Sequence, residues 1–522
     1  MDLLVDYLQS VARRFGDRVA LRVADGEHPV DLSYGHWQAR SSALARGLVD
    51  AGVRRGDAVV LLVGNASAAV YLVGYMGVLK AGAVAVPVNP RVARRELEHM
   101  VADSGAVAVV AGPDELGRAR EIAAARGLLV VAPGARPATP GAAPGGREPQ
   151  VLDFDELAAE AAGDFRVELD PGAVADILYT SGTTGLPKGV AATHASATVS
   201  HPFTPLDKGG VLLHAIPLAT FLGTHGTQSL CLRFALTNVL LPSFDAHRFA
   251  ALVESERPGW TIMVPAHALL LLESGALTGV DTSSVRMLLY GSAPMPHHAV
   301  EFLAAAFPRA TLLNGYGLTE GGTSVVVMPP GEALRRPGAV GRPLDPDGLR
   351  VVDDTGAAVT AGVVGEVTVR APTGQRAYHN DPDASAATWR GEWVHTGDLG
   401  FVDGDGYLHL VDRKKDVIVR GGYNVSSIEV ESALHEHPDV LEVGVVGMEH
   451  PVLGQDVAAV VRLRPGAPGL DAASAADFLA ERVADYKRPR VVVVTDRALP
   501  RTAMGKLDKR ALRVLVESRA TR

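Results

Sequence analysis

The chain of 522 residues is poor in cysteine and has no excess of basic side chains. Its one cysteine, Cys231, excludes a disulfide within the chain and fits the reducing conditions of the cytoplasm, where we expect the protein to reside. The formal net charge of −9 gives no positive field for nucleic acid or anionic lipid. Neither is therefore an expected partner.

A long hydrophobic run is also lacking once turn signals are considered. Residues 58–79 carry no charge and are long enough to span a bilayer, but Gly64 and Asn65 interrupt them. The turn separates a Val/Leu strand from a helix, and a second strand follows Lys80, so a βαβ unit is favoured over a membrane span. Residues 1–17 alternate apolar and charged side chains and lack the apolar core of a signal peptide.

A chain of 522 residues is too long for one core, so two or more domains are expected, and its apolar content of 47% fits a folded globular protein. Strand-like and helix-like segments alternate up to about residue 130 and again over residues 176–328, which predicts two doubly wound α/β subdomains. Residues 338–410 contain short β segments broken by turns, typical of a small β-barrel or an open sheet. We expect a large N-terminal domain over residues 1–412 and a smaller α+β domain over residues 413–522.

The most informative stretch runs from Tyr179 to Val190 and reads Tyr-Thr-Ser-Gly-Thr-Thr-Gly-Leu-Pro-Lys-Gly-Val. Its glycines let backbone N–H groups approach an anion, its hydroxyls add donors, and its lysine supplies a mobile positive charge. These groups suit a polyphosphate, although the spacing differs from that of the common P-loop NTPases. The candidate phosphate-binding residues are Thr180, Ser181, Gly182, Thr183, Thr184, Gly185 and Lys188.

A second motif, Asn314-Gly315-Tyr316-Gly317-Leu318-Thr319-Glu320, follows an apolar strand. Tyr316 offers an aromatic surface for a base, Thr319 a donor near an α-phosphate, and Glu320 a carboxylate for Mg²⁺. Asn314 is suited to read the adenine amino edge. Taken alone, the motif is equally typical of a glycine-rich turn between a strand and a helix, with Thr319 as the helix cap.

Charged residues in short turns downstream add to this pattern. Asp398 is suited to bind the two hydroxyls of a ribose, and Arg413 is a second ribose candidate. Lys506 follows a glycine near the C-terminus and is suited to bridge a carboxylate and a phosphate, two anions that otherwise repel each other. Each of these, as an isolated charge cluster, is more often a solvated turn.

In order and approximate spacing, these segments resemble the adenylate-forming superfamily, which includes acyl- and aryl-CoA synthetases, carrier-protein adenylation domains and luciferases. The resemblance implies a two-step ligase with a mobile C-terminal domain. A carboxylic acid reacts with Mg-ATP to give acyl-AMP and pyrophosphate, and a thiol then takes the acyl group. The implied co-substrates and cofactors are ATP, Mg²⁺ and coenzyme A.

The resemblance also implies roles for single residues. It assigns catalysis to Lys506, Glu320 and Thr319, with Glu320 as the Mg²⁺ ligand. It assigns Lys415 to the hinge, and Gly421 and Gly422 to the passage of the pantetheine arm of CoA, where side chains would obstruct it. The implied ATP- and AMP-binding residues outside the phosphate loop are Ser292, Ala293, Asn314, Gly315, Tyr316, Asp398 and Arg413.

The implied acid pocket departs from the family pattern at Thr220, which stands where histidine or another aromatic is usual. Phe221 and His225 are candidates to replace that aromatic. No Asp or Glu between Pro217 and Asp245 offers a partner for the ammonium group of an α-amino acid. The predicted pocket residues are Thr220, Phe221, His225, Gly291, Gly317, Gly322 and Val327, which leave aliphatic and aryl acids open.

We therefore predict an enzyme that activates a small carboxylic acid and transfers it to the CoA thiol. The alternative is a stand-alone adenylating enzyme that loads a carrier protein in trans. A nucleotide-binding protein without catalysis is disfavoured, because binding alone requires neither Glu320 nor Lys506. The sequence leaves the acid, the pathway and the oligomeric state, monomer or homodimer, undetermined.

Overall fold

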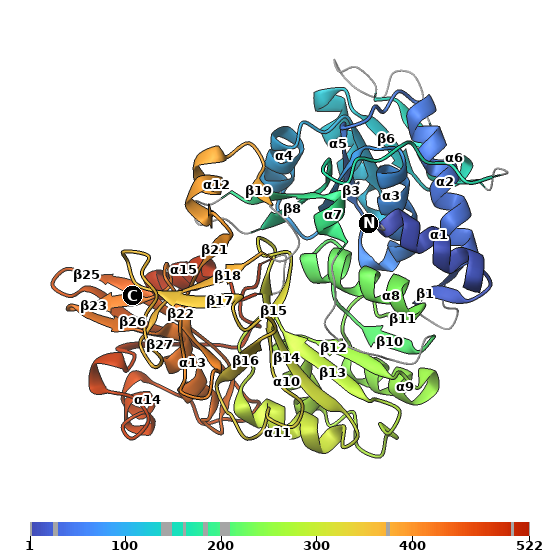
Figure 1. Ribbon diagram of the computed structural model, residues 1–522. Coiled ribbons are helices and arrows are strands. Elements are labelled where there is room, and N and C mark those ends of the chain that lie inside the picture. Colours follow the sequence, from blue (N-terminus) through green and yellow to red (C-terminus); the bar gives the residue numbers. More distant parts are fainter. Residues whose placement is uncertain are drawn as a thin grey trace.

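The computed structural model describes residues 3–24, 30–136, 149–159, 163–180, 186–198, 209–371, 376–502 and 506–520. These residues form three sheets with helices packed on them (Figure 1). Among them, no helix combines the length and the apolar character needed to cross a lipid bilayer.

The first sheet has eight strands, and most of its neighbouring strands run parallel. The predicted βαβ unit in residues 58–79 is confirmed, since β3, helix α3 (Ala68–Lys80) and β4 follow one another and the strands pair in parallel. In spatial order the strands are β19 (Ala377–Tyr378), β9 (Lys188–Thr193), β8 (Val174–Thr180), β4 (Val84–Val88), β3 (Ala58–Leu62), β5 (Ala108–Ala111), β6 (Leu129–Ala132) and β7 (Val151–Asp153).

The second sheet has 14 strands and a parallel core from β1 to β14. Strand β20 (Trp389–Arg390) pairs with β21, beside the main path. In spatial order the others are β17 (Leu349–Val352), β18 (Gly365–Arg370), β21 (Trp393–Val402), β22 (Leu408–Arg413), β16 (Ala339–Pro343), β15 (Thr323–Val327), β14 (Thr311–Leu318), β13 (Met287–Gly291), β12 (Trp260–Met263), β10 (Val211–His214), β11 (Thr237–Leu240), β1 (Val19–Val23) and β2 (Val30–Ser33).

The β-rich region over residues 338–410 is an open sheet. Strand β16 pairs with β15 on one side and with β22 on the other, so these strands continue the 14-stranded sheet. Among the described strands, none pairs so as to close a barrel. Of the two alternatives left by the sequence, the open sheet is therefore the one observed.

Helices fill the space between the two large sheets and cover their outer faces. One buried cluster joins α1, α2, α3 and α8 to strands of both sheets, for example through Leu8, Trp37, Leu61 and Leu240. The two other large buried clusters likewise lie between helices and one of the two large sheets. The central helices are α1 (Leu4–Phe15), α2 (Tyr34–Asp50), α3 and α8 (Gln228–Phe234); the outer ones are α4 (Arg94–Asp103), α5 (Leu116–Arg126), α9 (Ala246–Glu256), α10 (Pro265–Ser274) and α11 (His297–Ala306).

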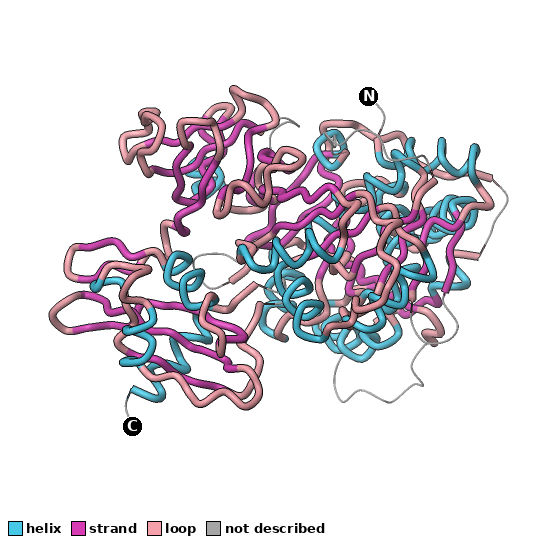
Figure 2. The backbone as a smooth tube through the Cα atoms, turned by 90° about the horizontal axis from the view of Figure 1, so that it is seen from below, coloured by secondary structure: helices cyan, strands magenta, loops and turns pink. Residues whose placement is uncertain are grey.

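The third sheet is five-stranded and belongs to the C-terminal part of the chain. Figure 2 shows its strands gathered at one side of the molecule, together with the C-terminus. The predicted division at residue 412 falls beside the end of β22 at Arg413, just before this sheet begins. Its elements are β23 (Ile418–Arg420), β24 (Tyr423–Val425), β25 (Val440–His450), β26 (Gly454–Leu463) and β27 (Val491–Thr495), with helices α13 (Ser427–His435), α14 (Ala472–Phe478) and α15 (Lys509–Ala520).

Lys80, at the end of α3, is 1% exposed, and its hydrogen-bond partners in the described part of the chain are all uncharged. Its Nζ donates to Gln38 Oε1 and Ser41 Oγ, both at 2.8 Å, and to Ser42 Oγ at 3.0 Å. Burial lowers the pKa of Lys80 to about 7. The folded state therefore loses this proton at a lower pH than the unfolded chain does.

We expect this lysine to make stability depend on pH. Below about pH 7 both the folded and the unfolded protein carry the Lys80 proton, so the buried charge destabilises the fold fully. This destabilisation fades as the pH rises toward ~10.4, the pKa of lysine in the unfolded chain. The unfolding free energy of the wild type relative to Lys80→Met should rise between pH 7 and pH 9.5, by an amount on the order of a few kcal/mol. Urea unfolding of both proteins at several pH values tests this, and a constant difference would contradict it.

Candidate active site

Asp398 and Arg413 face each other across two neighbouring strands. They are direct partners in the register of β21 and β22, and Arg413 Nε lies 2.9 Å from Asp398 Oδ1. Tyr316 of β14 donates its hydroxyl to Asp398 Oδ2 at 2.6 Å. The structure thus brings together three predicted nucleotide residues from three separate segments of the sequence, and it orients the Tyr316 ring through its hydroxyl. The roles in ribose and adenine binding remain predictions.

Thr319 and Glu320 lie at the tip of the hairpin formed by β14 and β15. The alternative of a strand-to-helix turn is therefore wrong, because the chain returns as an antiparallel strand. Glu320 Oε1 accepts hydrogen bonds from the hydroxyl of Tyr378, at 3.0 Å, and of Thr180, at 3.5 Å. The tip of the 14-stranded sheet thus meets the end of β8, from which the predicted phosphate loop departs.

The structure allows a test of whether Mg²⁺ fits at Glu320. In the described part of the chain, no three His, Cys, Asp or Glu side chains gather as a metal site. Mg²⁺ in nucleotide enzymes is often held by one or two carboxylates together with phosphate oxygens and water. A single carboxylate beside a phosphate loop fits that pattern, so Glu320 remains a suitable ligand.

Only the ends of the predicted phosphate loop can be located. Thr180 ends β8, and Lys188 begins β9. Lys188 Nζ forms an ion pair with Asp381 Oδ2 at 2.9 Å and lies 5.2 Å from the centre of the Tyr378 ring. Lys188 lowers the pKa of Asp381. The intervening candidates, Ser181, Gly182, Thr183, Thr184 and Gly185, lie outside the described residues.

Lys506 comes from the C-terminal part of the chain but lies in the field of the N-terminal site. Lys506 keeps solvent-exposed surface, yet protein atoms surround its ammonium group closely enough that burial is the main cause of its lowered pKa. Arg413 lowers this pKa further, while Asp398 and Glu320 raise it. The charges of Asp398, Glu320 and Arg413 therefore act on the ammonium group of Lys506, and its role in catalysis stays a prediction. Lys415, the predicted hinge residue, also acts on this ammonium group.

Gly421 and Gly422 occupy the turn between β23 and β24, on the exposed surface of the third sheet. Gly422 has a φ of +87°, and a Cβ on it would meet no atom within 4 Å. At Gly421, the nearest atom to such a Cβ is a methyl of Leu453, at 3.2 Å. Among the described residues, the neighbour of Gly421 is Leu453, which is not one of the predicted site residues.

Small residues cluster where β13, β14 and β15 meet. A Cβ on Gly291 would lie 2.4 Å from the carbonyl oxygen of Gly315, so glycine is needed for this close approach. Gly322 has a φ of +75°, and Ser292, directly after β13, has the unusual value of +68°. The same strands carry the other predicted residues of this group, namely Ala293 after β13, Asn314, Gly315 and Gly317 in β14, and Val327 in β15.

The predicted acid-pocket segment forms a π-helix, η3 (Leu222–Thr227), which continues into α8. Thr220 Oγ1 donates to the carbonyl of Pro217 at 2.8 Å and accepts from the amide of Gly223 at 3.0 Å. Its hydroxyl thus closes the turn that starts the helix. Phe221 packs edge-on against His225, with 5.5 Å between ring centres.

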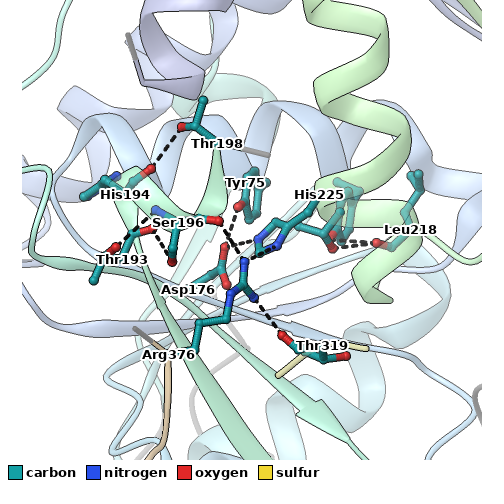
Figure 3. Close-up of polar contacts among 12 residues, drawn as sticks. Tyr75, Asp176, Thr193, His194, Ser196, Thr198, Leu218, His225, Thr319 and Arg376 are labelled. Atoms are coloured by element: carbon teal, nitrogen blue, oxygen red, sulfur yellow. Dashed lines mark hydrogen bonds and ion pairs between the residues drawn. The ribbon is translucent and has the colours of Figure 1, made fainter. Parts of the chain in front are cut away.

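His225 is 0% exposed, and both ring nitrogens have protein partners. The structure therefore corrects its predicted place, because a completely enclosed side chain does not line an open acid pocket. His225 instead contacts Asp176 and Arg376, as Figure 3 shows. Its position in the π-helix η3 directs the His225 side chain toward Asp176 of the eight-stranded sheet.

Replacing Thr220 by histidine tests whether this position lines the acid pocket. We expect Thr220→His to change the preferred acid or the rate of the thiol step, because a ring would fill the space beside the π-helix. Loss of the Thr220 turn contacts should also destabilise the protein by about 1 kcal/mol. Thr220→Ser keeps those contacts and serves as the control. Unchanged kinetics across an acid panel would show that Thr220 lies outside the pocket.

Sequence reasoning missed Arg376, Asp176 and Tyr378, which contact predicted site residues. Asp176 carried a usable signal, since it is a lone acid in the apolar strand β8 and is 0% exposed. Arg376 and Tyr378 had none, because they belong to a short segment whose neighbours are revealed only by tertiary structure.

Comparison with known proteins identifies the family. The AMP-binding enzyme family matches residues 8–379, and the AMP-binding enzyme C-terminal domain matches residues 429–506. The chain belongs to the AMP-binding enzyme family. A feruloyl-CoA synthase from Amycolatopsis sp is 35% identical to it over 492 residues, covering 92% of this chain and 93% of that one.

Solved structures agree with this assignment. The anthranilate CoA ligase AuaEII in complex with anthranoyl-AMP has a TM-score of 0.87 and 26% identity, covering 100% of this chain and 98% of that one. O-succinylbenzoate coenzyme A synthetase from Bacillus subtilis, in complex with ATP and magnesium ion, has a TM-score of 0.80 and 26% identity, covering 97% and 98%.

These findings confirm the fold class and the enzyme class predicted from the sequence. The chain is an AMP-forming acid–thiol ligase by family, with a large N-terminal part and a small C-terminal part.

Proposed function

We propose that this protein is an aryl acid–CoA ligase that works through an acyl-AMP intermediate in the cytoplasm. The observation that carries the proposal is that β14 joins two groups: its Tyr316 contacts the Asp398–Arg413 pair, and the turn after it carries Glu320, held by Tyr378. The charges of both groups act on Lys506 from the C-terminal part. The Asp398–Arg413 pair suits a nucleotide sugar, and Glu320 suits a metal-bound polyphosphate. Lys506 suits a reacting carboxylate.

In the first step, a carboxylate oxygen of the acid attacks the α-phosphorus of ATP. The bond to the bridging oxygen breaks, and pyrophosphate leaves with its electron pair. Lys506 supplies positive charge where the attacking carboxylate and the phosphate meet. Glu320 would hold Mg²⁺, which, when bound, neutralises charge on the phosphates. Tyr378 and Thr180 keep the Glu320 carboxylate in place.

In the second step, the CoA thiol attacks the acyl carbon, and AMP leaves with the electron pair of the acyl–oxygen bond. The thiol proton passes to solvent or to the departing phosphate. Gly421 and Gly422 are exposed in the present arrangement, in which Asp398 and Glu320 act electrostatically on Lys506. A rotation near Lys415 that exchanges these two faces would serve the second step, as the family resemblance implies.

The proposal of an aromatic acid rests on the small side chains around β13–β15 and on the relatives. The feruloyl, anthranilate and o-succinylbenzoate enzymes are each named for an aryl acid. Small residues at the ends of these strands would let a planar ring approach the backbone closely. The carrier-protein alternative has the same first step and differs only in the thiol.

Acid-dependent pyrophosphate release tests the proposal. The enzyme, with Mg-ATP, is offered cinnamates, benzoates, arylacetates, medium-chain fatty acids and amino acids, each with and without CoA. We expect release with at least one aryl acid and a CoA thioester as product. Preference for fatty acids would contradict the acid class, and acyl-AMP that CoA does not consume would favour a carrier protein.

A further inference from the structure

A cluster of ionisable side chains lies buried next to the Thr319–Glu320 turn. Asp176 in β8, His225 in η3 and Arg376 just before β19 are 0%, 0% and 3% exposed. Figure 3 shows them side by side, although they come from segments far apart in the sequence. Burying ionised groups is costly unless each is paired and hydrogen-bonded. The cluster therefore calls for a physical explanation beyond packing.

The hydrogen bonds of the cluster fix the tautomer of His225. Nε2 of His225 lies 2.6 Å from Asp176 Oδ2, and Nδ1 lies 3.2 Å from Arg376 Nη2. Since a carboxylate only accepts and a guanidinium only donates, Nε2 carries the proton and Nδ1 offers its lone pair. Tyr75 donates to the same Asp176 oxygen at 2.7 Å. The orientation of Asp176 thus determines that of His225, which in turn orients Arg376.

From its contact with His225, the guanidinium of Arg376 extends toward the Thr319–Glu320 turn of the active site. Nη1 donates to the carbonyl oxygen of Thr319 at 3.2 Å, and Nη2 donates to that of Ser196 at 2.8 Å. Within the described residues, the direct acceptors of Arg376 are thus neutral, and Asp176, on the far side of the imidazole, supplies a balancing charge. A rigid, planar donor of this kind fixes its acceptors in direction as well as in distance.

We propose that Arg376 is a positioning residue for adenylation, and that Asp176 and His225 hold its guanidinium against the carbonyl of Thr319. The proposal rests on the proposed function, in which Thr319 and Glu320 receive the α-phosphate and Mg²⁺. Tyr378 donates to Glu320, so the short segment that starts at Arg376 holds both residues of the turn.

The same segment ties the turn to the phosphate loop. Through β19, Ala377 and Tyr378 pair with Ala191 and Val190 of β9, the strand that begins at Lys188. Arg376 would therefore help to maintain the distance between the Thr319–Glu320 turn and the phosphate loop, the two sides of the proposed triphosphate site. Misplacing a catalytic group by 1 Å can slow a reaction about 100-fold, even when the altered residue does not touch substrate. Thioester formation from finished acyl-AMP has no pyrophosphate to position and depends less on this spacing.

The test compares Arg376→Gln with Arg376→Lys and with a matched control, Arg118→Gln. Arg118 also holds two backbone carbonyls, those of Pro90 and Val92, but does not contact the turn. For each protein we would measure acid-dependent pyrophosphate release, capture of supplied acyl-AMP by CoA, the Mg²⁺ concentration that half-saturates the first step, and thermal stability.

We expect Arg376→Gln to lower kcat of the first step about 100-fold, with little change in KM for the acid and a raised Mg²⁺ requirement. The capture step should fall less than about tenfold, and Arg376→Lys should recover part of the lost rate. Equal loss in both steps, or an effect no larger than that of Arg118→Gln, would overturn the positioning role. Wild-type enzyme that releases no pyrophosphate with any acid would contradict the proposed function instead.

A double substitution separates charge balance from positioning. Asp176→Asn alone leaves the Arg376 charge without its counter-charge and should lower thermal stability. In Asp176→Asn/Arg376→Gln both charges are gone, so stability should recover, while the first step stays as slow as in Arg376→Gln. A double variant that regained the first step would overturn the proposal, since Arg376 would then be dispensable.

Discussion

Replacing Lys506 by alanine should slow acyl-AMP formation 100- to 1000-fold, or by about 3–4 kcal/mol, because one preorganised positive charge is lost from the reacting anions. Lys506 lies in the field of Asp398, Glu320 and Arg413, so its charge acts at the proposed site of attack. Thioester formation from supplied acyl-AMP should be spared. Pyrophosphate release and CoA capture, measured separately, give the two rates.

Two controls sharpen this result. Lys487→Ala removes another lysine of the C-terminal part, one paired with Glu429, and should leave both steps unchanged. Lys506→Arg keeps the charge on a differently shaped group and should retain part of the first step. Equal losses of both steps in Lys506→Ala would contradict the assigned role and would indicate a general disturbance of the C-terminal part.

Replacing Gly422 by leucine should have the opposite effect. The family resemblance places this turn beside the pantetheine arm in the second step, and a leucine there would obstruct it. In the present arrangement a Cβ on Gly422 meets only open space, so adenylation should proceed normally. We expect thioester formation to fall at least about tenfold, a loss comparable to a modest displacement of reacting atoms.

A matched glycine controls for backbone strain. Gly466 also has a positive φ, +82° against +87° for Gly422, and a Cβ on it likewise meets no atom within 4 Å. Gly466→Leu therefore carries the same strain on another turn of the C-terminal part. If both variants lose thioester formation equally, strain explains the effect and the proposed passage for CoA is contradicted.

The sequence was sufficient for those features in which local pattern decides structure. The turn at Gly64 and Asn65 correctly divided an uncharged run into strand and helix, because glycine and asparagine favour turns wherever they occur. The alternation of strands and helices correctly indicated the parallel strands of the first sheet and the parallel core of the second. The motif order correctly identified the family, and Tyr316, Asp398 and Arg413 do meet in space.

Features that depend on long-range contacts were beyond the sequence. Thr319 and Glu320 lie on a hairpin instead of a strand-to-helix turn, since β15 finds its partner in tertiary structure. His225 was taken for a pocket residue because Thr220 stands where the family usually has histidine or another aromatic, and His225 is a nearby candidate to replace it. Its burial follows from Asp176 and Arg376, 49 and 151 residues away, and spacing alone indicates neither contact.

The measurement that tests the account most directly is the full stoichiometry with a preferred aryl acid. The enzyme would be incubated with that acid, Mg-ATP and CoA, and AMP, pyrophosphate and CoA thioester would be quantified together. We predict that the three products form in equal amounts and that acyl-AMP accumulates when CoA is left out. Release of ADP and phosphate, or acyl-AMP that persists with CoA present, would contradict an AMP-forming aryl acid–CoA ligase.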